Sequence, residues 1–385
     1  MAQTTLEKLR EIDLHLLTEV VRCERKDPNF TVQDWSVKRL SEMGITNPDG
    51  LFRFSGTGFR QSTGERDPEQ WSVVLKILKD PEQEQDPRNV WYWQREYLVA
   101  QSGLLSNLPG PLVAPEIFAV GEYLGERWIW MELVRDQAKE KWHMEEYIYA
   151  AGQIGLMDGK YLSRPTPADY PWLCRDHTRT ITTFYDQETD WDHPLVKKYF
   201  QSKERQKIDQ IWAEKERFIT AINALPQVMG HFDTMRRNLL VRVNRHGKKE
   251  LVGIDWGFFG TGPIGGQLSM MIPNGLLLFE IEPEEFPQVE ETAYPAYLQG
   301  LRDAGWQGDP SLVRLGYCTW TALWPGSIIP KAMELLSAEE TRAWVIKQFG
   351  RPIEEVAPFW QRLAWYCIDR ADEAREIIDR LRLVK

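Results

Sequence analysis

One short set of polar residues near the middle of the chain limits the possible folds more than any other feature. His231, Asp233 and Asn238 follow one another in the order His-x-Asp-x-x-x-x-Asn. Shortly afterwards the apolar run Leu251–Trp256 carries a second aspartate, Asp255, near its end. We expect a loop that is joined through a short hairpin to a buried strand, so that Asp255 follows the loop residues at the strand end.

These residue types at this spacing are typical of phosphoryl transfer from a nucleotide. One carboxylate orients the attacking hydroxyl and accepts its proton, while an amide oxygen and a second carboxylate hold Mg²⁺ against the phosphates. The offset from Asp233 to Asn238 equals that of the kinase catalytic-loop signature. We therefore predict that Asp233 is the catalytic base and that Asn238 and Asp255 are Mg²⁺ ligands. His231 is expected to support the loop through hydrogen bonds.

Each fragment taken alone also has a purely structural interpretation. A His-x-Asp pair is often a hydrogen-bonded turn, and Ile-Asp-Trp can end any buried strand. The order and spacing of the pieces, together with a suitable lysine upstream, favour catalysis. Two roles stay open for Arg236 and Arg237, which either neutralise phosphate charge or lie solvated on the surface.

The upstream lysine is Lys76, which lies inside the apolar run Trp71–Leu78. An unpaired buried charge is very costly, so a lysine in such a strand needs a counter-ion. Glu96, on the helix predicted to follow, is the natural partner, and a lysine held in this way can direct its ammonium group at nucleotide phosphates. The alternative is that Lys76 only extends along a half-exposed strand to reach water.

A phosphate-covering loop is harder to assign, because neither GxGxxG nor a Walker GxxxxGK[ST] motif occurs. The favoured candidate is Ser41–Gly50, where backbone N–H groups and the Ser41 hydroxyl can cap phosphates. The alternative is Ser55–Gly58, which is richer in glycine but follows the second predicted strand and is compatible with a simple turn.

The base of the nucleotide is expected at the connector that follows the strand Arg127–Leu133. Backbone hydrogen bonds near Glu132 and Val134 would hold the ring, and Met131 would shape the pocket. The same residues are also compatible with a plain buried strand end.

The pattern of the whole chain predicts an α+β protein of two parts. The first part, residues 1–135, combines a leading helix with a small antiparallel sheet, and the second, residues 136–385, is mostly helical. The expected helices are Thr4–Glu24, Trp91–Leu105, Glu204–Leu225 and several within Pro283–Lys385, and the expected strands are Trp35–Leu40, Leu51–Phe54, Trp71–Leu78, Glu116–Val120 and Arg127–Leu133.

Composition limits the cellular compartment and the classes of partner that we expect. The 47 basic and 57 acidic residues give a net charge of −10, which argues against a nucleic-acid or membrane-surface partner because both need a basic footprint. No apolar run reaches the roughly 18 residues of a membrane helix, and the N-terminus lacks a signal-peptide core. The four cysteines are widely spaced without a CxxC motif, as expected for reduced packing residues of a cytoplasmic protein. The oligomeric state is not predicted.

With these motifs in place, the chain resembles the aminoglycoside phosphotransferase/choline kinase-like family. The resemblance covers about residues 33–280 and is carried by Lys76, Arg95-Glu96, Met131–Val134, His231–Asn238 and Ile254-Asp255-Trp256. It implies a bilobal protein-kinase-like fold, ATP or GTP as phosphoryl donor, Mg²⁺, and a hydroxyl acceptor on a small molecule.

Two positions depart from the family pattern. Family loops usually read His-Gly-Asp, whereas Phe232 fills the middle position here, a change that we expect to be tolerated. The usual Asp-Leu pair after the Ile-Asp-Trp strand is replaced by Gln267-Leu268. That aspartate is generally structural or on the acceptor side, so its loss bears on aminoglycoside recognition more than on phosphoryl transfer.

The sequence thus predicts a small-molecule kinase whose acceptor is an aminoglycoside-like antibiotic, an amino alcohol or a related metabolite. One alternative is a nucleotide-binding pseudokinase that acts as a sensor or scaffold, although all five expected polar residues are present. Another is a hydrolase that uses Asp233 and Asp255 on a metal, although the further His or Asp ligands of such sites are missing.

Overall fold

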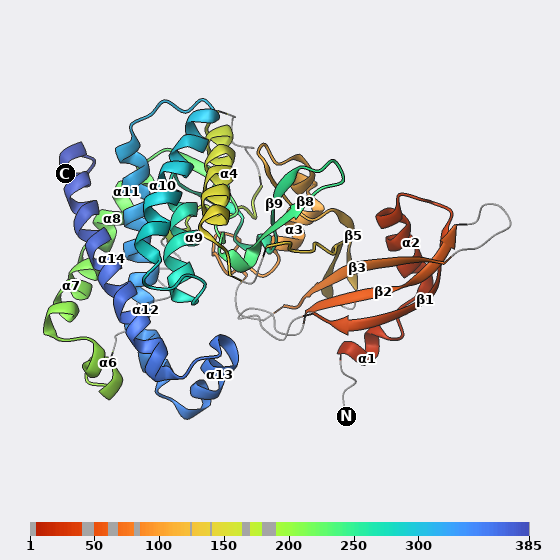
Figure 1. Cartoon of the computed structure of the whole chain (residues 1–385), viewed down its shortest axis with the longest axis horizontal. Coiled ribbons are helices and arrows are strands. Elements are labelled where there is room, and N and C mark those ends of the chain that lie inside the picture. The colour runs from red at the N-terminus through yellow and green to blue at the C-terminus, as the bar shows by residue number, and fades with distance from the viewer. Residues whose placement is uncertain are drawn as a thin grey trace. The chain divides into compact units, whose positions relative to one another are not determined.

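The computed structural model describes residues 5–40, 50–60, 68–80, 85–123, 125–138, 141–163, 170–178 and 190–384. The chain divides into two compact units, whose elements are labelled in Figure 1. Unit 1 consists of Met1–Gln85, Trp93–Leu108 and Val113–Arg135, and unit 2 of Asp86–Tyr92, Pro109–Leu112 and Asp136–Lys385.

Unit 1 is built on a five-stranded antiparallel sheet. In spatial order its strands are β1 (Phe30–Arg39), β2 (Leu51–Arg60), β3 (Glu69–Leu78), β6 (Glu126–Glu132) and β5 (Ile117–Tyr123). The helices of this unit are α1 (Thr5–Leu9), α2 (Leu14–Arg25) and α3 (Arg95–Gln101), followed by the 3-10 turn η1 (Leu104–Asn107).

The two faces of this sheet bury different side chains because successive residues of a strand point to opposite sides. On β3, Val73, Leu75 and Ile77 join a core that includes residues of α1 and α2, which lie beside the sheet in Figure 1. The opposite face, with Leu78, packs against Tyr97 of α3 in a second, smaller cluster. Lys76 lies on this second face, so the strand places its ammonium on the side of α3.

Several boundaries of unit 1 differ from the sequence prediction. The first strand begins at Phe30 rather than Trp35, and the strand predicted to end at Val120 runs to Tyr123. The leading helix is two helices, because the Asp13 side chain accepts the His15 N–H and starts α2 as an N-cap. The expected helix Trp91–Leu105 is reduced to α3 and η1. The second strand does not end at Phe54 but runs on to Arg60, with pairing to both neighbours.

Glycine explains the longer second strand. A Cβ on Gly56 would lie 2.0 Å from the Asp34 carbonyl oxygen, at the register shift between Val32 and Asp34. The Asp34 carboxylate also accepts the Thr57 N–H at 2.9 Å and the Thr57 hydroxyl at 2.7 Å. The glycine therefore serves a close backbone approach at a β-bulge rather than a turn.

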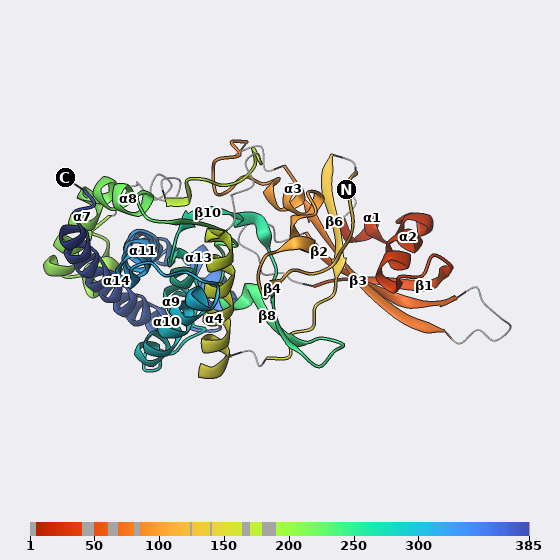
Figure 2. The same cartoon turned by 90° about the horizontal axis from the view of Figure 1, so that it is seen from above.

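Unit 2 is mostly helical. Within the described residues its helices are α4 (Met144–Leu162), α6 (Pro194–Tyr199), α7 (Ser202–Ala213), α8 (Lys215–Asn223), α9 (Gly266–Leu277), α10 (Phe286–Asp303), α11 (Pro310–Leu323), α12 (Pro325–Leu336), α13 (Glu339–Phe349) and α14 (Ile353–Leu381). Helix α10 packs along α4, and α9 packs against both. Helix α11 packs against α9 and also against α14 (Figure 2). The predicted helix Glu204–Leu225 is divided into α7 and α8 at Glu214, and the helical C-terminal region is confirmed.

Two small antiparallel ladders complete unit 2. Strands β8 (Leu239–Val243) and β9 (Lys249–Gly253) form a hairpin. The two-residue β4 (Leu112–Val113), of which Leu112 belongs to this unit, lies next to β9 in the sheet order. Strand β7 (Gln227–Gly230) pairs with β10 (Gly260–Pro263). In the part of the chain that the structure describes, none of the helices has the length and apolar character to cross a bilayer.

Candidate active site

The predicted catalytic loop lies between β7 and the 3-10 turn η2 (Arg236–Asn238), which leads directly into the β8–β9 hairpin. The hairpin returns the chain to the loop, because the Ile254 N–H donates to the Asn238 carbonyl oxygen at 2.9 Å. Asp255 therefore follows a residue that is bonded to the loop. The expected short hairpin between the two halves of the motif is present.

Asp233 and Asn238 are in direct contact. The Asn238 side-chain amide Nδ2 donates to the Asp233 carboxylate Oδ2 at 2.8 Å and to the Asp233 carbonyl oxygen at 3.0 Å. Each residue is only 8% exposed. Two hydrogen bonds from one amide fix the carboxylate relative to its own backbone, and they leave Oδ1 as the atom of the Asn238 amide that can bind a cation.

His231 ties the loop to the strand end that carries Asp255. Its ring Nδ1 accepts the Asp233 N–H at 3.2 Å, and its Nε2 lies 2.8 Å from the Ile254 carbonyl oxygen. A carbonyl only accepts, so both bonds form together only in a neutral imidazole that carries its proton on Nε2. The ring is fully buried against Trp256, in agreement with the supporting role expected for His231.

Asp255 adopts a left-handed backbone conformation with φ of 63°. Non-glycine residues rarely adopt this region, and such conformations cluster at functional sites. One carboxylate and one amide oxygen are a sparse donor set, and the described residues hold no group of three or more His, Cys, Asp and Glu suited to a metal. The set nevertheless suits Mg²⁺, which usually binds one or two protein oxygens and takes its other ligands from phosphates and water.

The two arginines of the loop are engaged with carboxylates. Buried Arg236 donates to Asp136 at 2.7 Å and lies over the Trp142 ring. Arg237, which is more exposed, contacts Glu280 at 3.0 Å. Arg236 therefore supports the fold of unit 2. Of its two predicted roles, the solvated surface position is wrong.

The two residues that depart from the family pattern, Phe232 and Gln267, contact each other at the predicted catalytic loop. Phe232 has φ of 53°, a region that glycine adopts at little cost, and its ring is 1% exposed and stacked on Trp320. The Gln267 side-chain oxygen accepts the N–H of His231 at 2.8 Å and of Phe232 at 3.2 Å. Sequence reasoning missed this role of Gln267, because the partner lies 36 residues away and is a backbone group.

In unit 1, Lys76 and Glu96 form the expected ion pair. The Lys76 Nζ lies 2.5 Å from the Glu96 Oε2, and the two side chains are 16% and 10% exposed. Lys76 is therefore held by a carboxylate on the α3 side of the sheet and does not simply extend into water. Its contact with nucleotide phosphates stays a prediction.

The predicted base-binding connector begins at the end of β6. Met131 and Glu132 are the last residues of this strand, and Val134 follows it, half-buried. The Glu132 N–H already donates to the Glu116 carbonyl oxygen at 2.9 Å, so it is committed to the sheet. Of the two residues predicted to bind the base through their backbone, Val134 is therefore the one expected to offer an N–H.

The favoured phosphate loop lies outside the described residues, except for Gly50. This applies to Ser41 in particular. The alternative candidate, Ser55–Gly58, is wrong as a loop or turn, because these residues are the middle of β2 and pair with both β1 and β3. Their backbone N–H and C=O groups serve the sheet, so they cannot wrap around phosphates.

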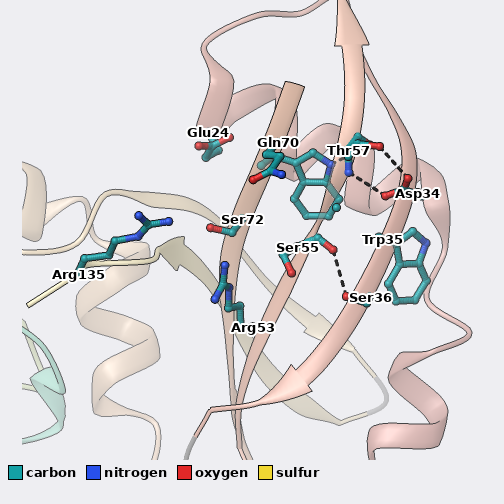
Figure 3. Close-up of a pocket in the computed structure, with 12 residues that line it drawn as sticks. Glu24, Asp34, Trp35, Ser36, Arg53, Ser55, Thr57, Gln70, Ser72 and Arg135 are labelled. Atoms are coloured by element: carbon teal, nitrogen blue, oxygen red, sulfur yellow. Dashed lines mark hydrogen bonds between the residues drawn. The ribbon is translucent and has the colours of Figure 1, made fainter. Parts of the chain in front are cut away.

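A cavity of about 560 Å³ instead opens on this part of the sheet (Figure 3). Cross-strand pairing sets Ser36, Ser55 and Ser72 in one row across β1, β2 and β3. Arg53 on β2 also lines the cavity, as does Arg135 beyond β6. Ser72 lies four residues before Lys76 on the same strand face, so this face presents hydroxyl and cationic groups. One sign of this face is visible in the sequence, namely that Arg53 interrupts the apolar residues Leu51, Phe52 and Phe54.

A comparison with known protein families identifies the family of this chain. The family model described as the phosphotransferase enzyme family matches residues 60–305, well over half of the 385 residues. The chain belongs to this phosphotransferase family. The family resemblance inferred from the motifs is thereby confirmed. A comparison of this phosphotransferase with curated proteins finds no match.

Solved structures give the fold of the phosphotransferase. A microcompartment-associated aminopropanol kinase is similar with a TM-score of 0.53 at 10% identity, over 94% of this chain and 98% of that one. Amicoumacin kinase hAmiN in complex with AMP-PNP, Ca²⁺ and Ami has a TM-score of 0.48 at 12% identity, over 94% and 96% of the two chains. Spectinomycin phosphotransferase APH(9)-Ia in complex with ADP and spectinomycin also has 0.48 at 12% identity, over 93% and 99%.

The aminopropanol kinase and the element order of the two units establish the fold class. The phosphotransferase has an α+β, kinase-like fold with an antiparallel-sheet N-terminal part and a mostly helical C-terminal part, as the sequence predicted.

Proposed function

We propose that this phosphotransferase moves the γ-phosphoryl group of ATP or GTP, bound with Mg²⁺, to a hydroxyl of a small molecule. The observation that carries the proposal is the geometry of Asp233. Its carboxylate accepts a hydrogen bond from the Asn238 amide, and its backbone N–H donates to the neutral imidazole of His231. A buried carboxylate oriented by a neutral amide donor is suited to accept a proton from an attacking alcohol.

In this proposal Asp233 orients the acceptor hydroxyl and takes its proton as the oxygen attacks. Asn238 keeps the carboxylate in place through its Nδ2, so the base does not have to reorganise during the reaction. His231 keeps the Asp233 backbone fixed to the strand end. Catalysis then rests on positioning and charge neutralisation rather than on a covalent intermediate.

In this proposal the metal, the phosphates and the base of the donor each have their own residues. Mg²⁺, when bound, neutralises the phosphate oxygens, and Asn238 Oδ1 with the Asp255 carboxylate would be its protein ligands. Lys76, fixed by Glu96, would contact the phosphates, and Ser41 would cap them. Met131, Glu132 and Val134 would border the base, with Val134 offering the backbone contacts. We thus assign donor binding to residues 1–135 and the catalytic, metal and acceptor sites to residues 136–385.

The acceptor is proposed only by class, as an aminoglycoside-like antibiotic, an amino alcohol or a related metabolite. The family supports a small-molecule acceptor. The aminopropanol kinase of similar fold makes amino alcohols a natural first choice for testing, although at 10% identity the likeness concerns the fold alone.

The test is nucleotide turnover with Mg²⁺–ATP and Mg²⁺–GTP against aminoglycosides, macrolides, amino alcohols, nucleosides and sugars. The Asp233→Asn variant removes the base and should lower acceptor-dependent turnover by roughly 10²- to 10⁴-fold. Asp303→Asn is the matched control, because Asp303 is an exposed residue at the end of α10. It makes the same chemical change and should leave turnover at the wild-type level.

The outcomes separate the competing functions. Acceptor-dependent release of ADP or GDP that disappears in Asp233→Asn supports the kinase. Mg²⁺-dependent nucleotide binding without phosphorylation of any acceptor favours a pseudokinase that acts as a sensor or scaffold. A chain that binds neither nucleotide contradicts the proposed function.

A further inference from the structure

A fully buried carboxylate lies behind the catalytic loop, at Asp158 on α4. One of its oxygens, Oδ2, accepts the Tyr297 hydroxyl proton at 2.5 Å. The other, Oδ1, accepts a short hydrogen bond from the Gln267 side-chain Nε2. The Tyr297 hydroxyl oxygen in turn accepts the Gly265 N–H at 3.0 Å. Asp158 is thus joined by neutral donors to both α10 and the start of α9.

Close helix packing makes these contacts possible. A Cβ on Gly155 would lie 2.1 Å from the Tyr297 carbonyl oxygen, so the glycine lets α4 and α10 approach at backbone distance. Asp158 is three residues further along α4 and therefore faces the same neighbour. The approach brings its carboxylate within hydrogen-bond distance of the Tyr297 hydroxyl.

The Gln267 side-chain amide connects this carboxylate to the catalytic loop. Its oxygen faces the N–H groups of His231 and Phe232, at 2.8 and 3.2 Å. Its nitrogen faces the Asp158 carboxylate, which only accepts. A single orientation of the amide satisfies all three bonds, since a 180° flip would set NH₂ against two N–H donors and an oxygen against a carboxylate.

Neighbouring contacts hold the backbone of Gln267 as well. The Thr234 hydroxyl donates to the Gln267 carbonyl oxygen at 2.5 Å. Residues on both sides of Asp233 therefore bond to Gln267, two through its side chain and one through its main chain. When Asp158 is ionised, its charge also polarises the amide and strengthens the bonds that the amide oxygen accepts.

We propose that Asp158 is a positioning residue of the catalytic loop, and that it acts through Gln267. Asp158 fixes the orientation of the Gln267 amide, whose oxygen then holds the His231 and Phe232 N–H groups and so the placement of Asp233. The catalytic part of this inference rests on the proposed function, whereas the structural part does not.

The test uses three variants and two measurements. Asp158→Leu removes the carboxylate at similar volume, and Gln267→Met removes the amide. The double variant Asp158→Asn/Gln267→Glu exchanges the chemistry of the two positions. In it the new carboxylate at position 267 would accept from the loop and from the new amide at position 158, whose oxygen would accept from Tyr297. Amide hydrogen exchange of residues 230–235 and kcat with the identified acceptor are the two measurements.

Asp158→Leu and Gln267→Met should each speed exchange at His231 and Phe232 by about tenfold or more, because the side-chain oxygen that accepts both N–H groups is displaced or lost. Each should lower kcat by roughly 10²-fold with little change in the KM for nucleotide. Combining both changes should add little to either effect, since they act through the same bonds. Asp158→Asn/Gln267→Glu should return exchange and kcat close to wild type.

Ile154→Ala provides the control for simple destabilisation of α4, where Ile154 is fully buried. It should leave exchange at His231 and Phe232 unchanged. Wild-type exchange in Asp158→Leu, multiplying effects in the combined variant, or failure of the exchanged pair to restore the loop would each overturn the inference. If Asp158→Leu does not fold, the exchanged pair and Gln267→Met still decide it. Altered exchange in a protein that phosphorylates no acceptor would refute the proposed function and leave the loop-positioning inference standing.

Discussion

Phe232 offers a test of the loop that needs no substrate. Its φ of 53° costs a non-glycine residue roughly 1–2 kcal/mol, whereas glycine adopts this region freely. Its ring is 1% exposed, stacked on Trp320 at 5.5 Å and edge-on to His177 at 4.7 Å. Removing such a ring should lower the free energy of unfolding by about 3–5 kcal/mol. Phe232→Ala loses the ring and keeps the strain, whereas Phe232→Gly loses both.

We therefore expect Phe232→Gly to be more stable than Phe232→Ala by about 1 kcal/mol, the reverse of the usual order. The control pair is Phe218→Ala and Phe218→Gly, because Phe218 is fully buried in the ordinary helix α8. There the glycine variant should be the less stable by about 1 kcal/mol. Urea unfolding followed by circular dichroism measures all four variants. Equal stability at position 232, or a less stable glycine variant, would refute the account of the loop backbone.

Three further predictions concern single contacts. Lys76→Met should weaken Mg²⁺–ATP binding by roughly 10- to 100-fold, measured by titration calorimetry, and unchanged affinity would exclude Lys76 from phosphate binding. Asn238→Ala should raise the Mg²⁺ concentration for half-maximal turnover by about tenfold or more, and an unchanged requirement would contradict its role as ligand. Burial raises the pKa of Asp158 to about 7 from 3.8, against the lowering effect of its Tyr297 and Gln267 hydrogen bonds. A raised pKa stabilises the fold below pH 4 and loses that contribution as pH rises through 7, so wild type should lose up to about 4 kcal/mol relative to Asp158→Asn over this range in urea titrations. Parallel pH profiles of the two proteins would show that this carboxyl is not perturbed.

Residue type and spacing were enough to predict much of this protein. The α+β class followed from periodic apolar segments, and the family was expected from the resemblance that a few polar residues at fixed offsets carry. The Lys76–Glu96 pair was predictable because a lysine in an apolar strand needs a carboxylate, and the next helix offered one. The short hairpin expected before Asp255 is also present.

Other features could not be predicted because they depend on contacts between distant segments. The strand through Ser55–Gly58 looked like a turn, since the sequence does not show that Gly56 faces the backbone of Asp34. The break at Asp13 depended on which of several polar residues would serve as an N-cap.

What the sequence determined by itself is the chemical inventory of the motif, namely two carboxylates, an amide and a histidine at set intervals. Tertiary structure alone decided how this inventory is held. The proton on His231 Nε2 follows from the carbonyl of Ile254, which comes directly after strand β9. The role of Gln267 follows from a carboxylate on α4 and from backbone groups of the loop. Hydrogen-bond direction depends on partners brought together by packing, and no single-sequence pattern records which partners those are.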